Sequence, residues 1–255
     1  MQKFVVMQIN ISSSEQEAGR RAAQIGADAI CAAIEARGEA SVILATGASQ
    51  FEVLDALVDM PGIDWSCATI FHLDEYIGIE ATHSASFIRY LKERFLARVP
   101  AVKDFVAING NAANIDLEIE RVSGIASQFD IDVAFVGIGE NGHLAFNDPP
   151  ADFETDAPFI RVELDKKCRT QQSNEGWFPT FEDVPSQAIS MSIRQITKST
   201  TIICTVPDER KAQAVKTALE GEITNLCPAS VLQAHANTFF FLDTAAARLL
   251  RKTAG

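Results

Sequence analysis

The chain has 255 residues, and its 22 Lys and Arg against 34 Asp and Glu give a formal net charge of −12 at pH 7. A hydrophobic content of 47% supplies a substantial core, which excludes a disordered chain. The acidic balance argues against nucleic acid or an anionic membrane as a partner.

The sequence shows no membrane-spanning or secretory segment. No apolar run approaches the roughly 18 to 20 residues that a bilayer requires, and the N-terminus lacks the core of a signal peptide. The five cysteines are widely spaced and form no CxxC motif, so we expect free thiols and neither disulfides nor a zinc cluster. These features predict a cytoplasmic protein.

Short β-branched runs alternate with stretches of helical spacing in the first half of the chain. A first apolar run covers residues 4–9. Ser14 and Glu17 form a capping signature before an amphipathic helix that ends at Gly38. A strand over 41–45 leads into a helix over 50–58, and a strand over 68–73 precedes helical spacing over about 83–99.

The second half continues the alternation, with strands over 131–136, 200–206 and 238–243 and a helix over 208–219. Residues 150–186 have weak periodicity and several prolines, which predicts an irregular lid. There is no internal repeat or linker, so a single domain over residues 1–255 is expected. The predicted fold is α/β, with a doubly wound, mostly parallel, Rossmann-like sheet and helices on both faces.

Polar segments follow three of the predicted strands, where ligands collect in such folds. After the second strand come Thr46, Gly47, Ala48 and Ser49. The free amides of a helix N-terminus and two hydroxyls suit a phosphate group. An ordinary turn capped by Ser49 is the alternative.

The other two segments carry groups able to move protons. Asp74 and Glu75 follow a buried run and offer a general base, unless they are only a polar strand end. His143 lies in a glycine-rich turn with Asn141 before it and Asp148 after it. A carboxylate there can fix the imidazole tautomer, although a lone loop histidine is often structural.

Together these segments resemble the glucosamine-6-phosphate deaminase/isomerase family, from about residue 15 to residue 242. The resemblance rests on three motifs in order: Ala45-Thr46-Gly47-Ala48-Ser49; Leu73-Asp74-Glu75-Tyr76 with Gly78; and Gly137-Ile138-Gly139, Gly142-His143, Ala145-Phe146-Asn147 and Pro149.

The resemblance implies conversion of an amino-sugar 6-phosphate and water into a ketohexose 6-phosphate and ammonia, without a cofactor. No metal is expected either, because the other histidines show no pairing typical of a metal site. It implies that Asp74 moves a proton between C2 and C1 and that His143 assists ring opening. Glu75 and Gly139 belong to the same motifs and are expected at the substrate. The phosphate would be held by the turn at Thr46, by Lys211 and by an arginine of the lid.

Arg169 is the candidate for that arginine, with Arg161 and Arg194 as competitors. Two positions depart from the family pattern. Asn141 stands where an aspartate is usual, and Asp148 stands where a glutamate is usual; Glu140 could hold the displaced carboxylate. Because these changes alter the hydrogen-bonding groups, galactosamine 6-phosphate is a candidate substrate beside glucosamine 6-phosphate.

Two other activities are alternatives. The related 6-phosphogluconolactonases share the glycine–histidine turn but hydrolyse a lactone, and homologous domains serve as non-catalytic sugar-phosphate sensors. Retention of both Asp74 and His143 argues for an enzyme. Some members of the family are hexamers and others monomers, so a homo-oligomer is compatible with the resemblance.

Overall fold

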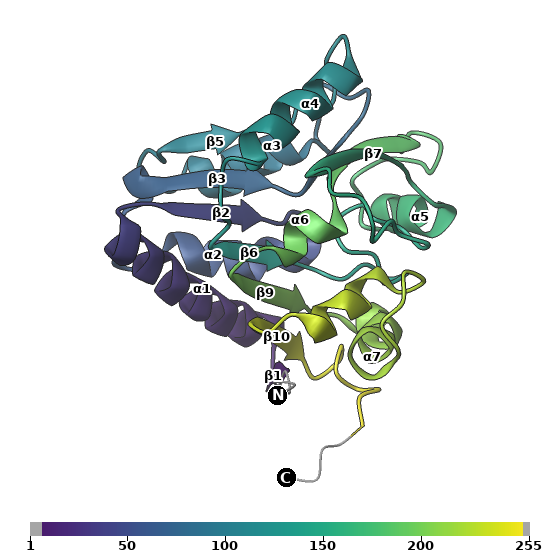
Figure 1. Cartoon of the computed structure of the whole chain (residues 1–255). Coiled ribbons are helices and arrows are strands. Elements are labelled where there is room, and N and C mark those ends of the chain that lie inside the picture. Colours follow the sequence, from purple (N-terminus) through teal and green to yellow (C-terminus); the bar gives the residue numbers. More distant parts are fainter. Residues whose placement is uncertain (1–6, 252–255) are drawn as a thin grey trace.

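A parallel sheet forms the centre of the molecule in the computed structural model, which describes residues 7–251. It has seven strands in the order β1-β10-β9-β6-β2-β3-β5, and every neighbouring pair is parallel (Figure 1). The strands are β1 (Gln8–Ser12), β2 (Ala40–Leu44), β3 (Ala68–His72), β5 (Asp104–Val106), β6 (Val133–Val136), β9 (Thr201–Val206) and β10 (Thr238–Asp243).

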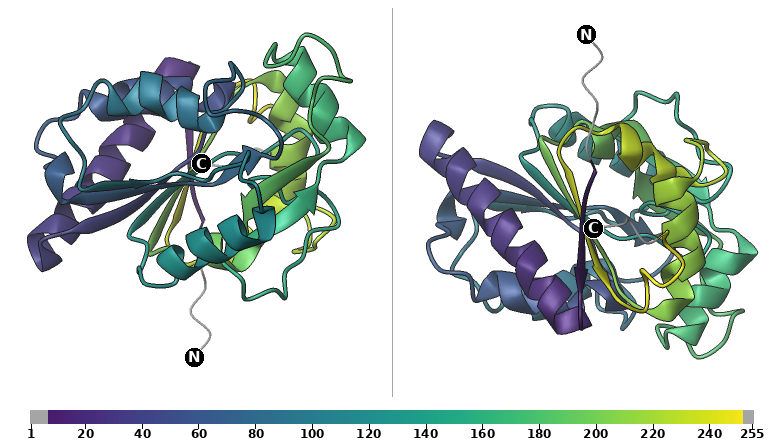
Figure 2. Two further views of the ribbon diagram at one scale, coloured as in Figure 1. Left: turned by 90° about the horizontal axis from the view of Figure 1, so that it is seen from above. Right: turned by 90° about the horizontal axis from the view of Figure 1, so that it is seen from below.

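Helices cover both faces of this sheet (Figure 2). One face carries α1 (Glu15–Arg37), α2 (Phe51–Val58) and α3 (Phe87–Leu91), and the other carries α4 (Ile115–Ala126), α6 (Ile193–Thr197) and α7 (Ala212–Glu220). Side chains of a strand alternate between the two layers, as Val42 and Leu44 pack with α1 and α2 while Ile43 packs on the opposite side. The predicted doubly wound fold is confirmed.

The first helix begins and ends where the sequence predicts. The Oγ of Ser14 accepts a hydrogen bond from the backbone N–H of Glu17 at 3.1 Å, and the carboxylate of Glu17 accepts from the N–H and hydroxyl of Ser13. Gly38 terminates the helix with φ of +78°, a left-handed conformation that glycine adopts without steric cost.

A second, antiparallel sheet lies beyond the carboxyl ends of the central strands (Figure 1). It joins β4 (Asp74–Tyr76), β8 (Gln187–Met191) and β7 (Phe159–Glu163), and α5 (Lys166–Asn174) lies in the connection between β7 and β8. The segment predicted as an irregular lid therefore contains a strand and a helix. Residues 74–76, predicted as a polar strand end, are themselves a strand because they pair with distant β8.

Three further boundaries differ from prediction. Residues 4–6 of the first apolar run lie outside the described residues, and β1 extends to Ser12. The helical spacing over 83–99 forms α3 only from Phe87 and continues as a π-helical turn, Lys92–Leu96. Before α7, residues Glu209–Lys211 form a 3-10 turn. Between residues 7 and 251, no helix has the length and apolar character to span a membrane.

Candidate active site

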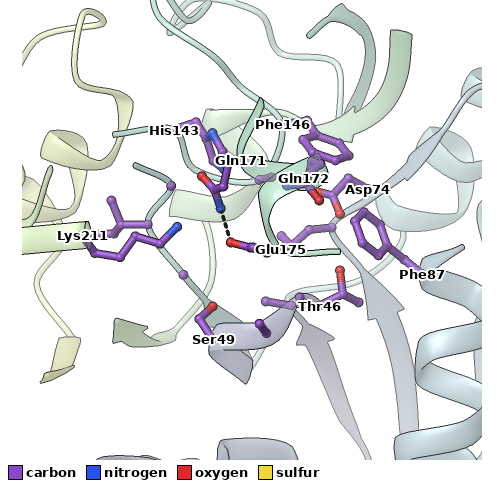
Figure 3. A pocket seen from close by; sticks show the side chains of 18 residues that line it. Thr46, Ser49, Asp74, Phe87, His143, Phe146, Gln171, Gln172, Glu175 and Lys211 are labelled. Carbon is purple, nitrogen blue, oxygen red and sulfur yellow. Dashed lines mark hydrogen bonds between the residues drawn. The ribbon is translucent and has the colours of Figure 1, made fainter. Parts of the chain in front are cut away.

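A cavity opens where the central strands end and the small sheet begins (Figure 3). Side chains and backbone from both sheets contribute to its wall. Its lining consists of Ala45, Thr46, Gly47, Ala48, Ser49, Leu73, Asp74, Phe87, Gly137, Ile138, Gly139, His143, Ala145, Phe146, Gln171, Gln172, Glu175 and Lys211. All three sequence motifs therefore meet in one place.

The turn after β2 and Lys211 form the part of the cavity suited to an anion. Gly47 adopts φ of +93°, and the N–H of Gln50 donates back to its carbonyl at 3.1 Å, which starts the turn before α2. Lys211 is only 5% exposed, and burial lowers the pKa of its ammonium group although Glu175 and Glu140 oppose this shift. Its ammonium group makes no ion pair within the described residues, so an anionic ligand would supply the missing charge.

Asp74 is a buried carboxylate without a compensating donor. Its side chain is 7% exposed, and no hydrogen bond reaches it from residues 7–251. Burial, and then the neighbouring charge of Glu75, raise the pKa of Asp74 well above its usual value. A carboxyl group in this environment gains a proton more readily than an ordinary one, as a carbon base requires.

His143 is held by a buried carboxylate. Its Nδ1 lies 3.1 Å from Oδ1 of Asp148, while Nε2 has no hydrogen-bond partner in the described part of the chain. Burial alone would raise the pKa of Asp148, but hydrogen bonds from His143, Asn141 and the backbone N–H of Asp165 lower it below its usual value. The ionised Asp148 accepts from Nδ1–H, so the neutral ring presents Nε2 as a proton acceptor.

Asn141 and Asp165 support this pair from behind the cavity wall. The amide of Asn141 donates to Asp148 at 2.8 Å and to Asp165 at 3.1 Å, and its carbonyl oxygen accepts from the N–H of His143. Asp165 is also the N-cap of α5, through a bond from the N–H of Cys168. The proton relay at His143 and the start of α5 thus share one hydrogen-bond network.

Close packing also fixes the histidine ring. A Cβ atom at Gly139 would lie 2.2 Å from the ring of His143, so only glycine fits at this position. Phe87 and Phe146 form an aromatic wall beside the cavity, with ring centroids 5.7 Å apart. Such a wall can contact the apolar C–H groups of a sugar.

Sequence reasoning missed three polar side chains that α5 and its C-cap bring into the cavity, Gln171, Gln172 and the C-cap residue Glu175. They follow Cys168 at intervals of three, four and seven residues, which is the spacing of one helix face. The helical spacing of these polar residues was the sequence signal that could have identified them.

Four predicted residues do not line the cavity. Asn141 and Asp148 lie behind His143, as described. Glu75 is buried, and its carboxylate accepts hydrogen bonds from the hydroxyl of Ser86 and from backbone N–H groups at the start of α3. Arg169 donates to backbone carbonyls of Phe181 and Val184 and stacks on the Phe181 ring.

The alternatives named for these roles also lie elsewhere. Arg161 pairs with Asp116 on α4, and Arg194 pairs with Glu154 and Asp156. Glu140 lies 3.7 Å from Arg210, so its carboxylate does not take the place of an acid at position 141. No arginine lines the cavity formed by the described residues.

One group near the site has the elements of a metal site. Ligand atoms of His143, Asp148 and Cys168 lie within 4.8 Å of one another. Burial, followed by the nearby charge of Asp148, raises the pKa of the Cys168 thiol well above its usual value. A protonated thiol is a poor metal ligand, and the hydrogen bond between His143 and Asp148 already accounts for their approach.

Comparison with known proteins connects this geometry to a family. A family profile described as glucosamine-6-phosphate isomerases/6-phosphogluconolactonase matches residues 13–241. A glucosamine-6-phosphate deaminase from Oenococcus oeni is 33% identical over 246 residues, which are 96% of this chain and 100% of that protein. A Streptococcus suis protein of the same name is 37% identical over 81% of this chain and 86% of its own.

Solved structures agree in fold. The structure of a monomeric glucosamine-6-phosphate deaminase superposes with a TM-score of 0.86 and 29% identity, over 95% of this chain and 100% of the other. For a 6-phosphogluconolactonase from Neisseria gonorrhoeae, described as putative, the TM-score is 0.74 at 19% identity, over 93% of this chain and 100% of the other. With the profile covering most of the chain and relatives above 30% identity, the protein belongs to the family of glucosamine-6-phosphate isomerases and 6-phosphogluconolactonases.

Proposed function

We propose that the protein is a deaminating aldose–ketose isomerase. It converts a 2-amino-2-deoxyhexose 6-phosphate and water into a ketohexose 6-phosphate and ammonia. The observation that carries this proposal is the buried carboxylate of Asp74, without a hydrogen-bond donor, in the same cavity as His143 and Lys211. The names of the curated relatives support the same reaction.

Binding begins with the phosphate group. The turn of Thr46, Gly47, Ala48 and Ser49 offers hydroxyls and free backbone N–H groups, and Lys211 offers a buried positive charge. Because this charge has no partner in the described chain, a phosphate gains its attraction without displacing another anion from it. This end of the cavity fixes the distal end of the sugar.

Ring opening is assigned to His143. Its unpartnered Nε2 takes the proton from the C1 hydroxyl and returns one to the ring oxygen, which gives the open-chain aldehyde. The ionised Asp148 stabilises the imidazolium that forms between these steps. Asn141 is a positioning residue, since it acts through Asp148 and the backbone of His143.

Asp74 then performs the isomerisation. Its carboxylate removes the C2 proton beside the aldehyde while the C1 oxygen takes up a proton, which gives an enolamine. The protonated Asp74 then delivers its proton to C1, and loss of one N–H proton, which balances the proton taken up at the C1 oxygen, leaves a neutral imine at C2. Water adds across the C=N bond of the imine to give a carbinolamine. Its hydroxyl proton passes to the nitrogen as the C2–N bond breaks, which leaves the C2 ketone and releases ammonia. None of these reaction steps requires a residue of the protein to be oxidised or reduced.

The reaction is tested with glucosamine 6-phosphate and galactosamine 6-phosphate, by following ammonia and ketose phosphate together. Turnover of either sugar with equal yields of both products supports the proposal. Failure to release ammonia and ketose phosphate from either sugar, or hydrolysis of 6-phosphogluconolactone, would contradict the proposal. Tight binding without turnover would favour a sugar-phosphate sensor.

Lys211→Met is expected to raise KM about 10- to 100-fold, because a charge-assisted contact to phosphate contributes roughly 1.5–3 kcal/mol. The effect on kcat should be smaller, since Lys211 lies away from the reacting carbons in this assignment. Lys216→Met, in the helix α7 that follows Lys211 but outside the cavity, is the matched control. An unchanged KM in Lys211→Met would remove the residue from the phosphate site.

We also propose that the enzyme works in the cytoplasm, which the five free thiols support. A homo-oligomer is the remaining expectation from the family resemblance. Sedimentation of the purified protein measures its assembly state directly.

A further inference from the structure

The face of α5 that enters the cavity carries three polar groups in fixed orientations. The hydroxyl of Tyr76 donates to Oε1 of Gln172 at 2.7 Å, which leaves the amide N–H groups of Gln172 without an assigned partner in the described chain. The amide of Gln171 donates to Glu175 at 2.8 Å, and its carbonyl oxygen accepts from the N–H of Glu140. Both amide orientations are thus set by hydrogen bonds to neighbouring groups of the protein.

Glu175 completes the row. One carboxylate oxygen accepts from Gln171, and the other accepts from the indole N–H of Trp177 at 3.1 Å. Each oxygen keeps a second lone pair, so the side chain can accept further hydrogen bonds. Gly176, with φ of +80°, turns the chain between Glu175 and Trp177. The row therefore combines acceptors on Glu175 with donors on Gln172.

These groups lie over the middle of the cavity. Lys211 and Ser49 lie at one side and Asp74 and Phe87 at the other, with the three α5 side chains between them (Figure 3). In a hexose 6-phosphate, the reacting carbons C1 and C2 and the phosphate on C6 are at opposite ends. The hydroxyls on C3 and C4 then fall opposite α5.

The charge of Glu175 gives a second reason. It lies close enough to Lys211 to raise the pKa of that ammonium group, and its negative charge cannot itself hold the phosphate that Lys211 attracts. A carboxylate at this position needs a different role, and acceptance of hydrogen bonds from neutral hydroxyls is the chemistry it offers. Asn141 and Asp148 lie behind His143 and cannot contact a C4 hydroxyl directly.

We propose that Gln172 on α5 and Glu175 at its C-terminal end, with Gln171 holding Glu175 in place, form hydrogen bonds to the C3 and C4 hydroxyls of the amino sugar and determine which C4 epimer is accepted. This inference rests on the proposed function. It assigns substrate selection to the small sheet and its helix, whereas proton transfer belongs to the motifs at the ends of the central strands.

The test compares kcat/KM for glucosamine 6-phosphate and galactosamine 6-phosphate, which differ only at C4. Glu175→Gln and Gln172→Leu should each change the ratio of the two values by about tenfold or more, because a lost hydrogen bond to a hydroxyl leaves its partner unpaired. Asn174→Ala, on the exposed side of α5, should leave the ratio unchanged. Glu175→Gln should also tighten competitive inhibition by inorganic phosphate.

The outcomes separate the two proposals. If the unmodified protein deaminates neither sugar, the proposed function fails and the ratio is undefined. If it is active but both variants reduce kcat/KM equally for the two epimers, α5 does not read the C4 hydroxyl and the inference is wrong. Circular dichroism of each variant establishes that it folds, and Tyr76→Phe offers a milder second perturbation of Gln172 that leaves the cavity wall in place.

Discussion

Asp74 combines a requirement of catalysis with a cost to the folded state. A buried carboxylate without a donor is costly to ionise, and its pKa rises because the neutral form is favoured in the folded protein. In the unfolded chain the group ionises at an ordinary carboxyl pKa. Stability from this group is therefore complete at low pH and is lost as the pH rises from that ordinary value through the raised one.

Asp74→Asn should lower kcat about 10²- to 10⁴-fold, the usual contribution of a positioned general base, while sugar-phosphate binding persists. The same substitution should raise the free energy of unfolding at pH 8 relative to the parent, and the gain should shrink toward pH 4. Steady-state kinetics and urea unfolding measure the two effects.

The exposed Asp130→Asn is the matched control and should change neither quantity. If Asp74→Asn kept full turnover, the carboxylate would not be the base. A loss of stability at pH 8 would contradict the account of its burial.

The glycine-rich turn after β6 acts as one structural unit at the scale of an element. It carries the histidine on a segment where a Cβ at Gly139 or Gly142 would meet a neighbouring side chain within 3 Å, and Gly142 takes φ of +85° so that the chain can reverse. The ring of His143 fills the space in front of Gly139. The orientation of the ring is thus set by both packing and hydrogen bonding.

Gly139→Ala should displace the His143 ring and reduce kcat about 10²-fold, since misplacement of a proton-transfer group by an ångström has this scale of effect. KM should change less, because the phosphate site is separate. Gly124→Ala provides the comparison: its added Cβ meets open space in α4, and helix propensity predicts a gain of roughly 0.5–1 kcal/mol. Retention of parental kcat in Gly139→Ala would show that the ring position is not critical.

The sequence predicted elements whose signals are local and failed on those that depend on distant partners. Ser14 and Gly38 mark the ends of α1 through caps that any reader of the chain can find. In contrast, β4 has three residues and exists because β8 pairs with it from more than a hundred residues away. The helix α5 lacks an apolar stripe because its inward face is polar, so the periodicity of apolar residues gave no sign of it.

The candidate site divides in the same way. Motifs at strand ends could be placed together because the topology of a parallel sheet brings carboxyl ends to one edge. The direction of the Arg169 side chain could not be predicted. Successive residues of a helix are rotated by roughly 100° about its axis, and Arg169 comes two positions before Gln171. That rotation directs the arginine toward Val184 while the amide enters the cavity.

At the scale of the whole molecule, His72 makes the free energy of unfolding depend on pH. It is fully buried in β3, and its Nε2 accepts a hydrogen bond from the N–H of Ile108 at 2.9 Å. Burial lowers its pKa from 6.5 to about 4. The unfolded chain takes up a proton near pH 6.5 and the folded protein does not, so stability is present above pH 6.5 and is lost as the pH falls toward 4.

His72→Gln keeps an acceptor for Ile108 and removes the titration. Between pH 7 and pH 5, the parent should lose about 2 kcal/mol more of its unfolding free energy than the variant, a figure that follows from the two pKa values. Urea denaturation at both pH values gives the comparison. An equal loss in His72→Gln and the parent would refute the linkage.

The small antiparallel sheet joins two parts of the chemistry mechanically. Strand β4 carries Asp74 and pairs with β8, while α5 lies in the connection between β7 and β8. The base Asp74 and the helix α5 over the sugar are therefore both attached to the small sheet. A ligand that displaces α5 is expected to displace Asp74 as well. A sugar that contacts α5 poorly is therefore expected to bind more weakly and to place its C2 less accurately beside Asp74. Such a sugar should have a lower kcat as well as a lower affinity.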